Sequence, residues 1–461
     1  MQKPANPQGT RDFGPKVMRK RTYILDTIKK IFIKYGFEHL ETPALEKLDT
    51  LEGKYGEEGN KLLYKIRSNK ELRETLGKED LEFYDKIFKK EGNEEWIPSK
   101  SKLGLRYDLT IPFARFVVQH RNDITFPFRR YQIQQVWRGD RPAKGRFREF
   151  TQCDADCIGS RSLIHEADLV KIYSEALFNL GLENAVVKLN HRKFLEALVD
   201  ELNLDFPVER FTSTLDKLDK IGEEGVTKEL VKNGVSEEKC KLLFSLIDSV
   251  SLNSENITQI AESFGDNPYA KEAVDELEEL LSFIEVTDLK IDVQLDLSLA
   301  RGLDYYTGCI FEAIVPDSGI GSISGGGRYD NLTGVFGLKD VSGVGISFGI
   351  DRIYEILESQ NKWPENLQAS STVVVCHFDK KSMLYANSVA SKLRLNNVPA
   401  IVYPDGKKIN KQFDFANKTG ARFAVVIGES EIESKTLSVK DLVRGTQESL
   451  TMDEAIKRFN L

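Results

Sequence analysis

The alternation of apolar and polar residues predicts the elements of the first 190 positions. Residues 17–36 repeat apolar side chains at intervals of three and four and end at Gly36, which predicts a helix, and the following FEHLETPALE predicts a strand. FPFRRYQIQQVWRGD and RFREFTQCDADCIG both alternate, and a polar turn joins them. We therefore predict an antiparallel hairpin with an arginine-rich tip over 125–158, followed by a helix over 162–182.

Helical periodicity dominates the centre of the chain, and the pattern changes again in its last quarter. Residues 70–92 are charged with a helical period and predict a surface insertion, while 190–290 form an acidic, helix-patterned region. Strand signals return at 291–316 and 341–349, on either side of the glycine cluster GIGSISGGGRYD. From about 371, short apolar strands alternate with helices, which is typical of a separate α/β domain.

These patterns predict an α/β protein built from a divided main domain, an insertion and a C-terminal domain. The main domain comprises 1–187, with an extra insertion at about 68–98, and 291–362. A helical insertion occupies 188–290, and a smaller α/β domain occupies 371–461.

Composition bears on location and partners. The five cysteines of the 461 residues form no CxxC pair, so we expect neither a disulfide framework nor a metal site from a protein motif. No stretch approaches 18 uninterrupted apolar residues, and the N-terminus has no leader pattern, so we expect a cytoplasmic protein with no membrane partner. The net charge of −7 argues against nonspecific nucleic-acid binding and against DNA as a partner. Residues 371–461 are nevertheless basic, with 14 Lys and Arg against 10 Asp and Glu.

The arginine-rich hairpin WRGDRPAKGRFREF is the first candidate for chemistry. Such a charged run is often only a solvated surface. Arginine also binds phosphate through its planar fork, and Phe147 or Phe150 can stack on a base, so the combination favours a nucleoside triphosphate. The chain has no GxxxxGK[ST], no GxGxxG after a strand and no HExxH. The common phosphate-binding and metal-binding motifs therefore do not explain its function.

Other motifs are individually weak. Asp108 and Thr110 in LRYDLTIPFAR alternate on one side of a predicted strand and could both address an ammonium group, although the segment taken alone is better explained as a strand end with a helix cap. GISFG fits the GxSxG of a hydrolase, but its histidine would have to be His377, in another predicted domain. Glycines at alternate positions of GVGISFGIDR indicate close approach of a backbone or ligand.

The order of these pieces resembles class II aminoacyl-tRNA synthetases, and specifically the histidyl-tRNA synthetase family. FEHLETPALE with Pro43, WRGDRPAKGRFREF and GVGISFGIDR resemble the three class II motifs, and RGLDYYTG and GGGRYD resemble two histidine-specific signatures. The resemblance covers nearly the whole chain. It implies an α+β catalytic domain with a mainly antiparallel sheet, a helical insertion and a C-terminal α/β anticodon-binding domain.

The resemblance also implies the reaction and its participants. Such a protein activates L-histidine with ATP and Mg²⁺, releases pyrophosphate, transfers histidine to tRNA(His) and forms a homodimer through its first motif. Two anions must meet, and at ~3.5 Å and an effective dielectric constant of ~20 their repulsion is about 5 kcal/mol, so cationic side chains are required.

By resemblance, each group of residues takes one part of this reaction. The catalytic arginines are Arg138 and Arg301. The histidine-binding residues are Asp108, Thr110, Gln152, Asp156, Tyr305, Tyr306 and Tyr329. The ATP-binding residues are Arg138, Asp140, Arg146, Phe150 and Arg352. Beyond the resemblance, we expect Arg141 and Arg148 of the hairpin to contact the acceptor end of the tRNA.

Two other kinds of protein share the class II motifs but differ in function. A histidine- or tRNA-sensing regulatory paralogue would keep the fold without catalysis, but such proteins typically lose the catalytic arginines or the C-terminal domain, both of which are present. Another class II synthetase would lack the paired tyrosines of RGLDYYTG. The chain departs from the family pattern in WRGD, where Phe and Glu usually flank the arginine, and at Asp156, where many bacterial members have Glu.

Overall fold

The computed structural model describes residues 3–66, 102–143, 145–247, 249–251, 254–300, 306–364, 367 and 372–460. The chain divides into two compact units, Met1–Gln360 and Asn361–Leu461. The insertion predicted at 70–92, within about 68–98, lies outside the described residues, as do Arg301 and Tyr305.

The main sheet of the first unit has nine strands among the described residues and is mainly antiparallel. Its strand order is β1-β5-β6-β12-β11-β10-β7-β9-β8, in which β1 pairs with β5 and β7 pairs with β9 in parallel. The strands are β1 (Glu38–His39), β5 (Phe128–Trp137), β6 (Glu149–Ile158), β7 (Val186–His191), β8 (Ser249–Ser251), β9 (Asp292–Asp296), β10 (Cys309–Ile314), β11 (Ser324–Tyr329) and β12 (Gly343–Gly349). The predicted fold class is confirmed, and β5 and β6 are the predicted hairpin.

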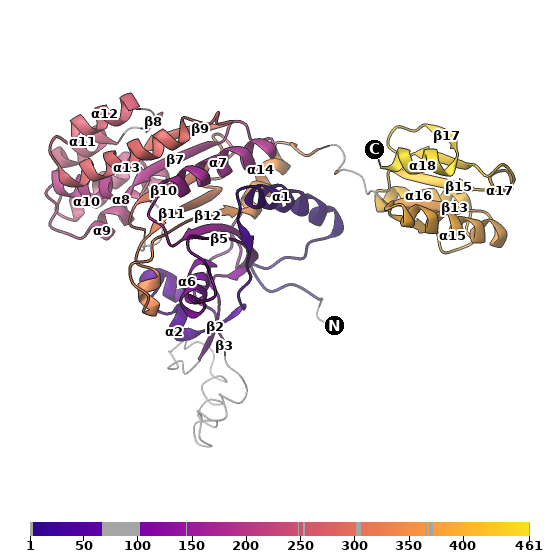
Figure 1. The fold of residues 1–461 in the computed structure, drawn as a ribbon, viewed down its shortest axis with the longest axis horizontal. Coiled ribbons are helices and arrows are strands. Elements are labelled where there is room, and N and C mark those ends of the chain that lie inside the picture. Colours follow the sequence, from indigo (N-terminus) through magenta and orange to yellow (C-terminus); the bar gives the residue numbers. More distant parts are fainter. Residues whose placement is uncertain are drawn as a thin grey trace, which may run out of the picture. The chain divides into compact units, whose positions relative to one another are not determined.

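Helices cover one face of this sheet through their apolar stripes. Figure 1 shows α1 (Pro15–Lys34), α7 (Ile164–Asn179) and α14 (Ile350–Ser359) packed together on that face. The first helix ends before Gly36, whose φ of 77° favours glycine, as the sequence predicts. On β12, the Phe348 ring has its centroid 6.0 Å from that of Phe32 and 5.2 Å from that of Tyr173. Burial of these rings leaves the opposite face of the sheet for polar side chains.

A smaller layer borders the opposite face. It contains the antiparallel sheet β2-β4-β3 and short helices. Its elements are β2 (Leu45–Lys47), α2 (Leu48–Leu51), α3 (Gly56–Lys61), β3 (Lys65–Ile66), β4 (Leu103–Leu105), α6 (Thr110–Gln119) and the 3₁₀ turn η1 (Thr333–Phe336). Leu51, Tyr107 and Phe113 share one apolar cluster with Tyr329 of β11. This cluster joins the small layer to the main sheet.

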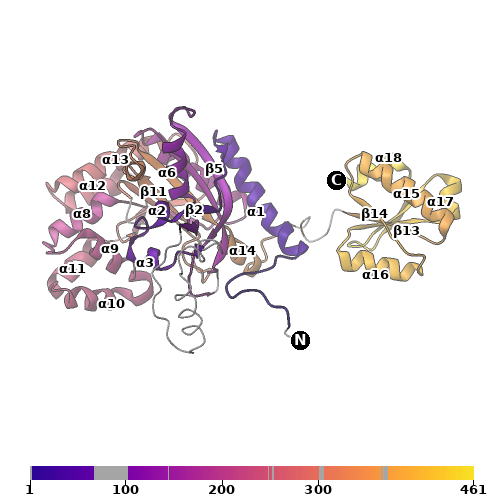
Figure 2. The same cartoon turned by 90° about the horizontal axis from the view of Figure 1, so that it is seen from below.

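Six helices lie in the described part of the predicted helical region. They are α8 (Arg192–Glu201), α9 (Val208–Leu215), α10 (Leu218–Lys232), α11 (Glu237–Leu246), α12 (Ser254–Ser263) and α13 (Pro268–Ile284). Figures 1 and 2 show them gathered at the end of the main sheet that carries β8 and β9. The longest, α13, begins where the Asn267 side chain accepts hydrogen bonds from two backbone N–H groups and Pro268 occupies the first turn. Its buried side chains recur at helical spacing and pack against α7, α8 and α12.

The second unit is the predicted α/β domain. Its five-stranded sheet has the order β14-β13-β15-β16-β17, with the first three strands parallel and the last two added antiparallel. Its elements are β13 (Val373–His377), α15 (Lys380–Leu395), β14 (Ala400–Val402), α16 (Ile409–Thr419), β15 (Phe423–Ile427), α17 (Glu429–Ser434), β16 (Leu437–Asp441), β17 (Gln447–Leu450) and α18 (Met452–Phe459). One apolar cluster packs α15 and α18 on the sheet, and a second packs α16 on it.

The structure differs from the sequence predictions at three places. FEHLETPALE forms β1 and β2, two short strands in different sheets, instead of one strand. The glycine cluster contains the central strand β11, which carries Gly325, Gly326 and Gly327. Asp108 and Thr110 do not alternate in a strand, because β4 ends at Leu105 and Thr110 begins α6; Asp108 Oδ1 instead accepts the Ile111 N–H in the first turn of that helix. Among the described helices, none has the length and apolar content to cross a membrane.

Candidate active site

One cavity of about 390 Å³ opens on the polar face of the main sheet. It lies between β6, β11 and β12, the loop that follows β5, and the beginnings of α6 and α14. Its lining includes nine of the residues expected from the sequence: Asp108, Thr110, Arg138, Asp140, Arg146, Phe150, Gln152, Tyr306 and Arg352. Asp156 and Tyr329 line a smaller, adjoining hollow that shares Thr110 and Tyr306 with the main cavity.

The strand β6 supplies one wall because its side chains alternate. Phe150, Gln152, Asp154 and Asp156 are two positions apart and therefore point to the same face of the sheet. The intervening Cys153 points to the helix-covered face and is fully buried. A single strand thus presents an aromatic ring, an amide and two carboxyl groups in a row.

Arg138 has a defined orientation at the end of β5. Its Nε donates to the Tyr107 carbonyl at 3.1 Å and its Nη2 donates to Gln152 Oε1 at 3.2 Å. Its guanidinium carbon lies 4.4 Å from the centroid of the Tyr107 ring and 5.1 Å from that of Phe150. These contacts fix a planar cation at the cavity wall, where it suits a carboxylate or a phosphate.

The hairpin loop holds further charged groups at the cavity. Arg146 Nη2 donates to Asp140 Oδ1 at 2.7 Å, and the backbone N–H and C=O groups of Ala143 and Arg146 pair with one another. On α14, Arg352 donates to the Ser322 carbonyl, which holds its guanidinium near the chain segment before β11. Phe150 and Arg352 line the same cavity and together can hold a flat heterocycle.

Asp351 adds a carboxylate that sequence reasoning did not single out. Arg11 and Arg21 both donate to its Oδ1, the former at 2.6 Å. Its Oδ2 is buried and has no hydrogen-bond partner in the described part of the chain. Asp351 also lines the cavity, which places its carboxyl group beside any ligand bound there.

Asp108 also has a carboxylate oxygen without a hydrogen-bond partner in the described chain. Its Oδ1 accepts from the Tyr55 hydroxyl at 2.9 Å and from the Ile111 backbone N–H at 3.2 Å, which ties it to the first turn of α6. Its Oδ2 is buried without a hydrogen-bond partner among the residues that the structure describes. Burial raises the pKa of this carboxyl, and the Ile111 N–H, Arg138 and Tyr55 oppose the increase. An ammonium group in the cavity would satisfy the remaining oxygen.

Asp156 lies at the floor of the smaller hollow. Tyr329 donates its hydroxyl hydrogen to Asp156 Oδ1 at 2.7 Å, and Arg130 Nη2 lies 2.8 Å from Oδ2. Arg130 is fully buried and faces Asp156 across the β5/β6 pair. A Cβ at Gly345 would come 2.1 Å from Asp156 Oδ1, so the glycine of β12 gives this carboxylate its space.

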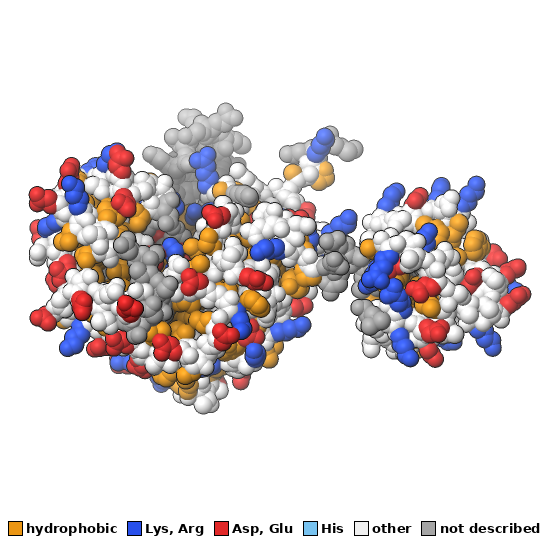
Figure 3. All heavy atoms as spheres, turned by 90° about the horizontal axis from the view of Figure 1, so that it is seen from above, with side chains coloured by type: hydrophobic (Ala, Val, Ile, Leu, Met, Phe, Trp, Pro, Cys, Tyr) orange, Lys and Arg blue, Asp and Glu red, His pale blue; other side chains and the backbone are white. Residues whose placement is uncertain are grey.

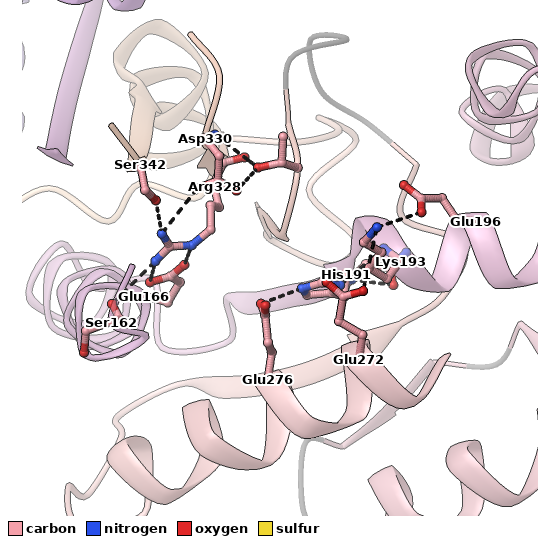
Figure 4. Close-up of polar contacts among 12 residues, drawn as sticks. Ser162, Glu166, His191, Lys193, Glu196, Glu272, Glu276, Arg328, Asp330 and Ser342 are labelled. Atoms are coloured by element: carbon pink, nitrogen blue, oxygen red, sulfur yellow. Dashed lines mark hydrogen bonds and ion pairs between the residues drawn. The ribbon is translucent and has the colours of Figure 1, made fainter. Parts of the chain in front are cut away.

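Tyr306 enters the cavity from the end of the RGLDYYTG segment. A Cβ at Gly327 would come 2.8 Å from its ring, so the glycines of β11 also make room for this side chain. Thr307 anchors the segment: its N–H donates to the Arg328 carbonyl at 2.8 Å, and its hydroxyl donates to Asp330 at 2.6 Å. Arg328 in turn donates to Glu166 of α7 from Nε at 2.5 Å and from Nη2 at 2.7 Å (Figure 4). A buried ion pair thus lies directly behind the anchor.

A second polar group joins the helical region to the same end of the sheet (Figure 4). His191, the last residue of β7, approaches Glu276 of α13 at 2.9 Å through Nε2. Its Nδ1 accepts the Lys193 N–H, so Nε2 carries the hydrogen and donates to Glu276. Together with Cys309 these residues are the one group of three in the described chain that could hold a metal ion. The His191–Glu276 hydrogen bond already satisfies two members of the group.

Two described residues of the prediction, Arg141 and Arg148, line neither the main cavity nor the smaller hollow. Arg141 is exposed, and Arg148 donates from Nε to the Asp140 carbonyl at 3.1 Å. Sequence reasoning missed Arg130, Asp154, Glu166 and Asp351; the partners of Arg130, Glu166 and Asp351 are distant in sequence. Only the alternation of β6, which places Asp154 between Gln152 and Asp156, could have indicated one of them.

The comparisons with known proteins agree on one family. The family profile described as Histidyl-tRNA synthetase matches residues 95–353, and the one described as Anticodon binding domain matches 372–460. The chain is 45% identical to a histidine–tRNA ligase of Flavobacterium johnsoniae, with 98% of each chain covered. It is also 45% identical to a histidine–tRNA ligase of Cytophaga hutchinsonii, with 100% of each covered.

Solved structures give the same result. The histidyl-tRNA synthetase of Nostoc sp. PCC 7120 superposes with a TM-score of 0.82 at 30% identity, covering 99% of this chain and 100% of that one. A Bacillus halodurans chain titled ATP phosphoribosyltransferase regulatory subunit/histidyl-tRNA synthetase shares the fold, with a TM-score of 0.68 at 20% identity over 92% of this chain and 98% of that one. The chain, with its mainly antiparallel catalytic-type sheet and its C-terminal α/β unit, belongs to the histidyl-tRNA synthetase family.

Proposed function

We propose that this protein is a histidine–tRNA ligase. It joins the carboxylate of L-histidine to the α-phosphate of ATP, releases pyrophosphate, and then transfers histidine to the 3′ end of tRNA(His). The observation that carries the proposal is the gathering of nine expected residues, arginines and carboxylates among them, around one cavity.

Arg138 brings the two reacting anions together. Its contacts with Tyr107 and Gln152 hold the guanidinium before substrate binds, so little reorganisation is needed during the reaction. Neutralising the repulsion between carboxylate and phosphate is worth about 5 kcal/mol at ~3.5 Å and an effective dielectric constant of ~20. Arg301, outside the described residues, is proposed to act on the same anions from the RGLDYYTG segment. Catalysis then rests on positioning and fixed charge.

ATP occupies the part of the cavity that the hairpin loop and α14 border. Phe150 and Arg352 stack on the adenine, Asp140 lies near its edge, and Arg146 contacts the outer phosphates. The ion pair of Arg146 with Asp140 supports this assignment, because it keeps the arginine at the cavity before ATP binds.

Mg²⁺ accompanies the triphosphate. Asp351 fits it, since Mg²⁺ prefers oxygen ligands and Oδ2 is a buried carboxylate oxygen without a hydrogen-bond partner among the described residues. When bound, the ion would neutralise phosphate charge. Arg11 and Arg21 position this carboxylate through its other oxygen.

Histidine occupies the amino-acid end of the cavity. Asp108, Thr110 and Gln152 bind its α-ammonium group, consistent with the unpartnered Oδ2 of Asp108. Asp156 and the tyrosines Tyr305, Tyr306 and Tyr329 surround the imidazole. A site that hydrogen-bonds a polar side chain rejects analogues that lack it by roughly 10⁴ to 10⁵, so an editing domain is unnecessary.

Each domain has its own part in this function. Residues 1–187 and 291–362 form the catalytic domain and 188–290 the helical insertion, with β7 joining the catalytic sheet. Residues 371–461 bind the anticodon, in keeping with their net positive charge. Figure 3 shows Lys and Arg side chains grouped on the visible face of this unit, beside separate acidic groups. Arg141 and Arg148 contact the acceptor end, and the protein acts as a cytoplasmic homodimer.

ATP–pyrophosphate exchange with each of the twenty amino acids tests the proposal. We expect exchange with histidine alone, and histidine-specific charging of tRNA. Exchange with a different amino acid would overturn the assignment of the cavity. Histidine binding without any exchange would favour a regulatory paralogue, and Arg138→Ala would then leave the behaviour unchanged.

A further inference from the structure

Asp154 is a buried carboxyl at the floor of the smaller hollow to which the roles above assign nothing. It lies on β6 between Gln152 and Asp156 and points to the same face of the sheet. It is 2% exposed, and it lines the hollow together with Thr110, Tyr306 and Tyr329.

The carboxyl groups of this region outnumber the buried cations. Asp108, Asp154 and Asp156 are each 2% exposed, and Arg130 is the fully buried arginine among them. Arg138, partly exposed, stands at the rim of the main cavity. A pocket with this balance of charge favours a ligand that brings positive charge or N–H donors.

The two carboxylates of the hollow differ in how well they are satisfied. Each oxygen of Asp156 has a close partner, Tyr329 at 2.7 Å and Arg130 at 2.8 Å. The oxygens of Asp154 receive only two long contacts, both of 3.3 Å and both from the single Gln152 amide group, together with the adjacent Ser347 hydroxyl. Asp156 Oδ2 makes no hydrogen bond in the described chain but is committed to the ion pair with Arg130, whereas Asp154 has no cationic side chain within ion-pair distance among the described residues. Asp154 is therefore the carboxylate of the hollow whose charge a ligand's N–H group can meet.

We propose that Asp154 is a further specificity-determining residue of this pocket, whose ionised carboxylate accepts a hydrogen bond from an imidazole N–H of the bound histidine. The inference rests on the proposed function and adds to it. Its position beside Asp156, Tyr306 and Tyr329, which the proposed function places around the imidazole, assigns it to the ring. With Asp156 and Tyr306 also at the ring, the pocket can engage both ring nitrogens.

Protonation of Asp154 controls this contact. Burial raises the pKa of its carboxyl from 3.8 to about 7; Arg130 and Ser347 oppose the increase, and Asp156 and Asp108 add to it. In the free enzyme the carboxylate form is thus dominant above about pH 7 and is lost as pH falls through this value. Binding of the imidazole needs that form, so it weakens on the acidic side.

The test compares the wild type with Asp154→Asn in ATP–pyrophosphate exchange. We expect the KM for histidine to rise by about 10- to 100-fold and the KM for ATP to stay within about twofold. Asp296→Asn is the matched control, because Asp296 is an equally buried aspartate of the same sheet, paired with Lys188 at 2.6 Å and remote from the hollow. An unchanged KM for histidine in Asp154→Asn, or an equal rise for both substrates, would overturn the proposal.

The pH profile separates a chemical role from a structural one. The ratio of kcat/KM for histidine, wild type over Asp154→Asn, should fall as pH is lowered from 8 to 6, since titration of free histidine cancels in the ratio. A flat ratio would contradict the proposal, and a ratio that rises at low pH would show that a protonated Asp154 donates instead. Ser347→Ala provides an independent measurement. Loss of the hydroxyl should move the acidic limb of the pH profile of kcat/KM for histidine to higher pH, because the hydroxyl lowers the pKa of Asp154. An unmoved limb would contradict the assignment of this limb to Asp154. Absence of histidine-dependent exchange in the wild type would instead refute the proposed function.

Discussion

Removal of the Glu166 carboxylate should destabilise the first unit strongly. Glu166 is fully buried on α7, and its two oxygens accept from Arg328 Nε at 2.5 Å and Nη2 at 2.7 Å. Arg328 is 4% exposed and also donates to Ser342. Glu166→Ala would leave this guanidinium buried with two of its hydrogen bonds lost.

The expected cost follows from the burial of the pair. Removing one partner of a buried ion pair typically destabilises a protein by about 3–5 kcal/mol, because the remaining charge stays desolvated. Replacing both partners in Glu166→Ala/Arg328→Met removes that unpaired charge, so the double variant should be more stable than Glu166→Ala alone. The strength of the effect therefore depends on the uncompensated arginine rather than on the lost contact.

Urea unfolding followed by far-UV circular dichroism and by loss of ATP–pyrophosphate exchange measures this effect. Glu175→Ala is the matched control on the same helix, because Glu175 pairs with the exposed Lys34 and should contribute no more than about 1 kcal/mol. A Glu166→Ala variant as stable as Glu175→Ala would refute the reasoning. So would a double variant less stable than the single one.

The same variant should affect histidine use. Arg328 also accepts the Thr307 N–H through its carbonyl, and Thr307 anchors the segment that carries Tyr306. We expect Glu166→Ala to raise the KM for histidine more than the KM for ATP in the fraction that remains folded. Equal changes in the KM for histidine and the KM for ATP would show that the substitution acts only through the stability of the whole unit.

Three further predictions concern charge and the C-terminal unit. Arg138→Ala and Arg301→Ala should each reduce adenylate formation by at least about 100-fold, measured as pyrophosphate exchange, and near-normal turnover would contradict the proposed neutralisation of the reacting anions. Deletion of 371–461 should reduce tRNA charging far more than exchange, and equal losses would argue against anticodon binding. Because the pKa of buried Asp154 is raised from 3.8 to about 7, the folded state retains a proton that the unfolded chain releases, so stability falls as pH rises from about 4 to 7. Asp154→Asn should flatten this slope in urea titrations at several pH values, and an unchanged slope would contradict the assignment.

Local pattern predicted the elements whose signals are continuous along the chain. The hairpin of β5 and β6, the first helix up to Gly36 and the alternating strands and helices after 371 all follow from periodicity and turn residues. The strand β11 was missed because Gly325, Gly326 and Gly327 lack the apolar side chains by which a strand is recognised. In the sheet these glycines are required for contact: a Cβ at Gly326 would lie 2.1 Å from the Gly345 carbonyl oxygen.

The sequence likewise predicted only part of the candidate site. The arginines and carboxyl groups of the hairpin were predicted as a group, since they lie within one segment, whereas their individual roles stay predictions. The buried partners could not be found from the sequence, because Glu166 and Arg328 are 162 positions apart and Tyr55 and Asp108 are 53 apart. Nothing in either local segment indicates the other.

The sequence by itself determined the kind of protein: the family signatures, the basic C-terminal part and the face of β6 on which the polar side chains lie. Only the tertiary structure decided which groups meet on that face. Strand order places β12 and β5 beside β6, so Ser347 and Gln132 flank Asp154, and Gly345 and Arg130 flank Asp156. The physical reason is that alternation along a strand sets the direction of a side chain. Its partners, its burial and hence its pKa depend on which strands become its neighbours, and one of these, β12, lies almost 200 residues further along the chain.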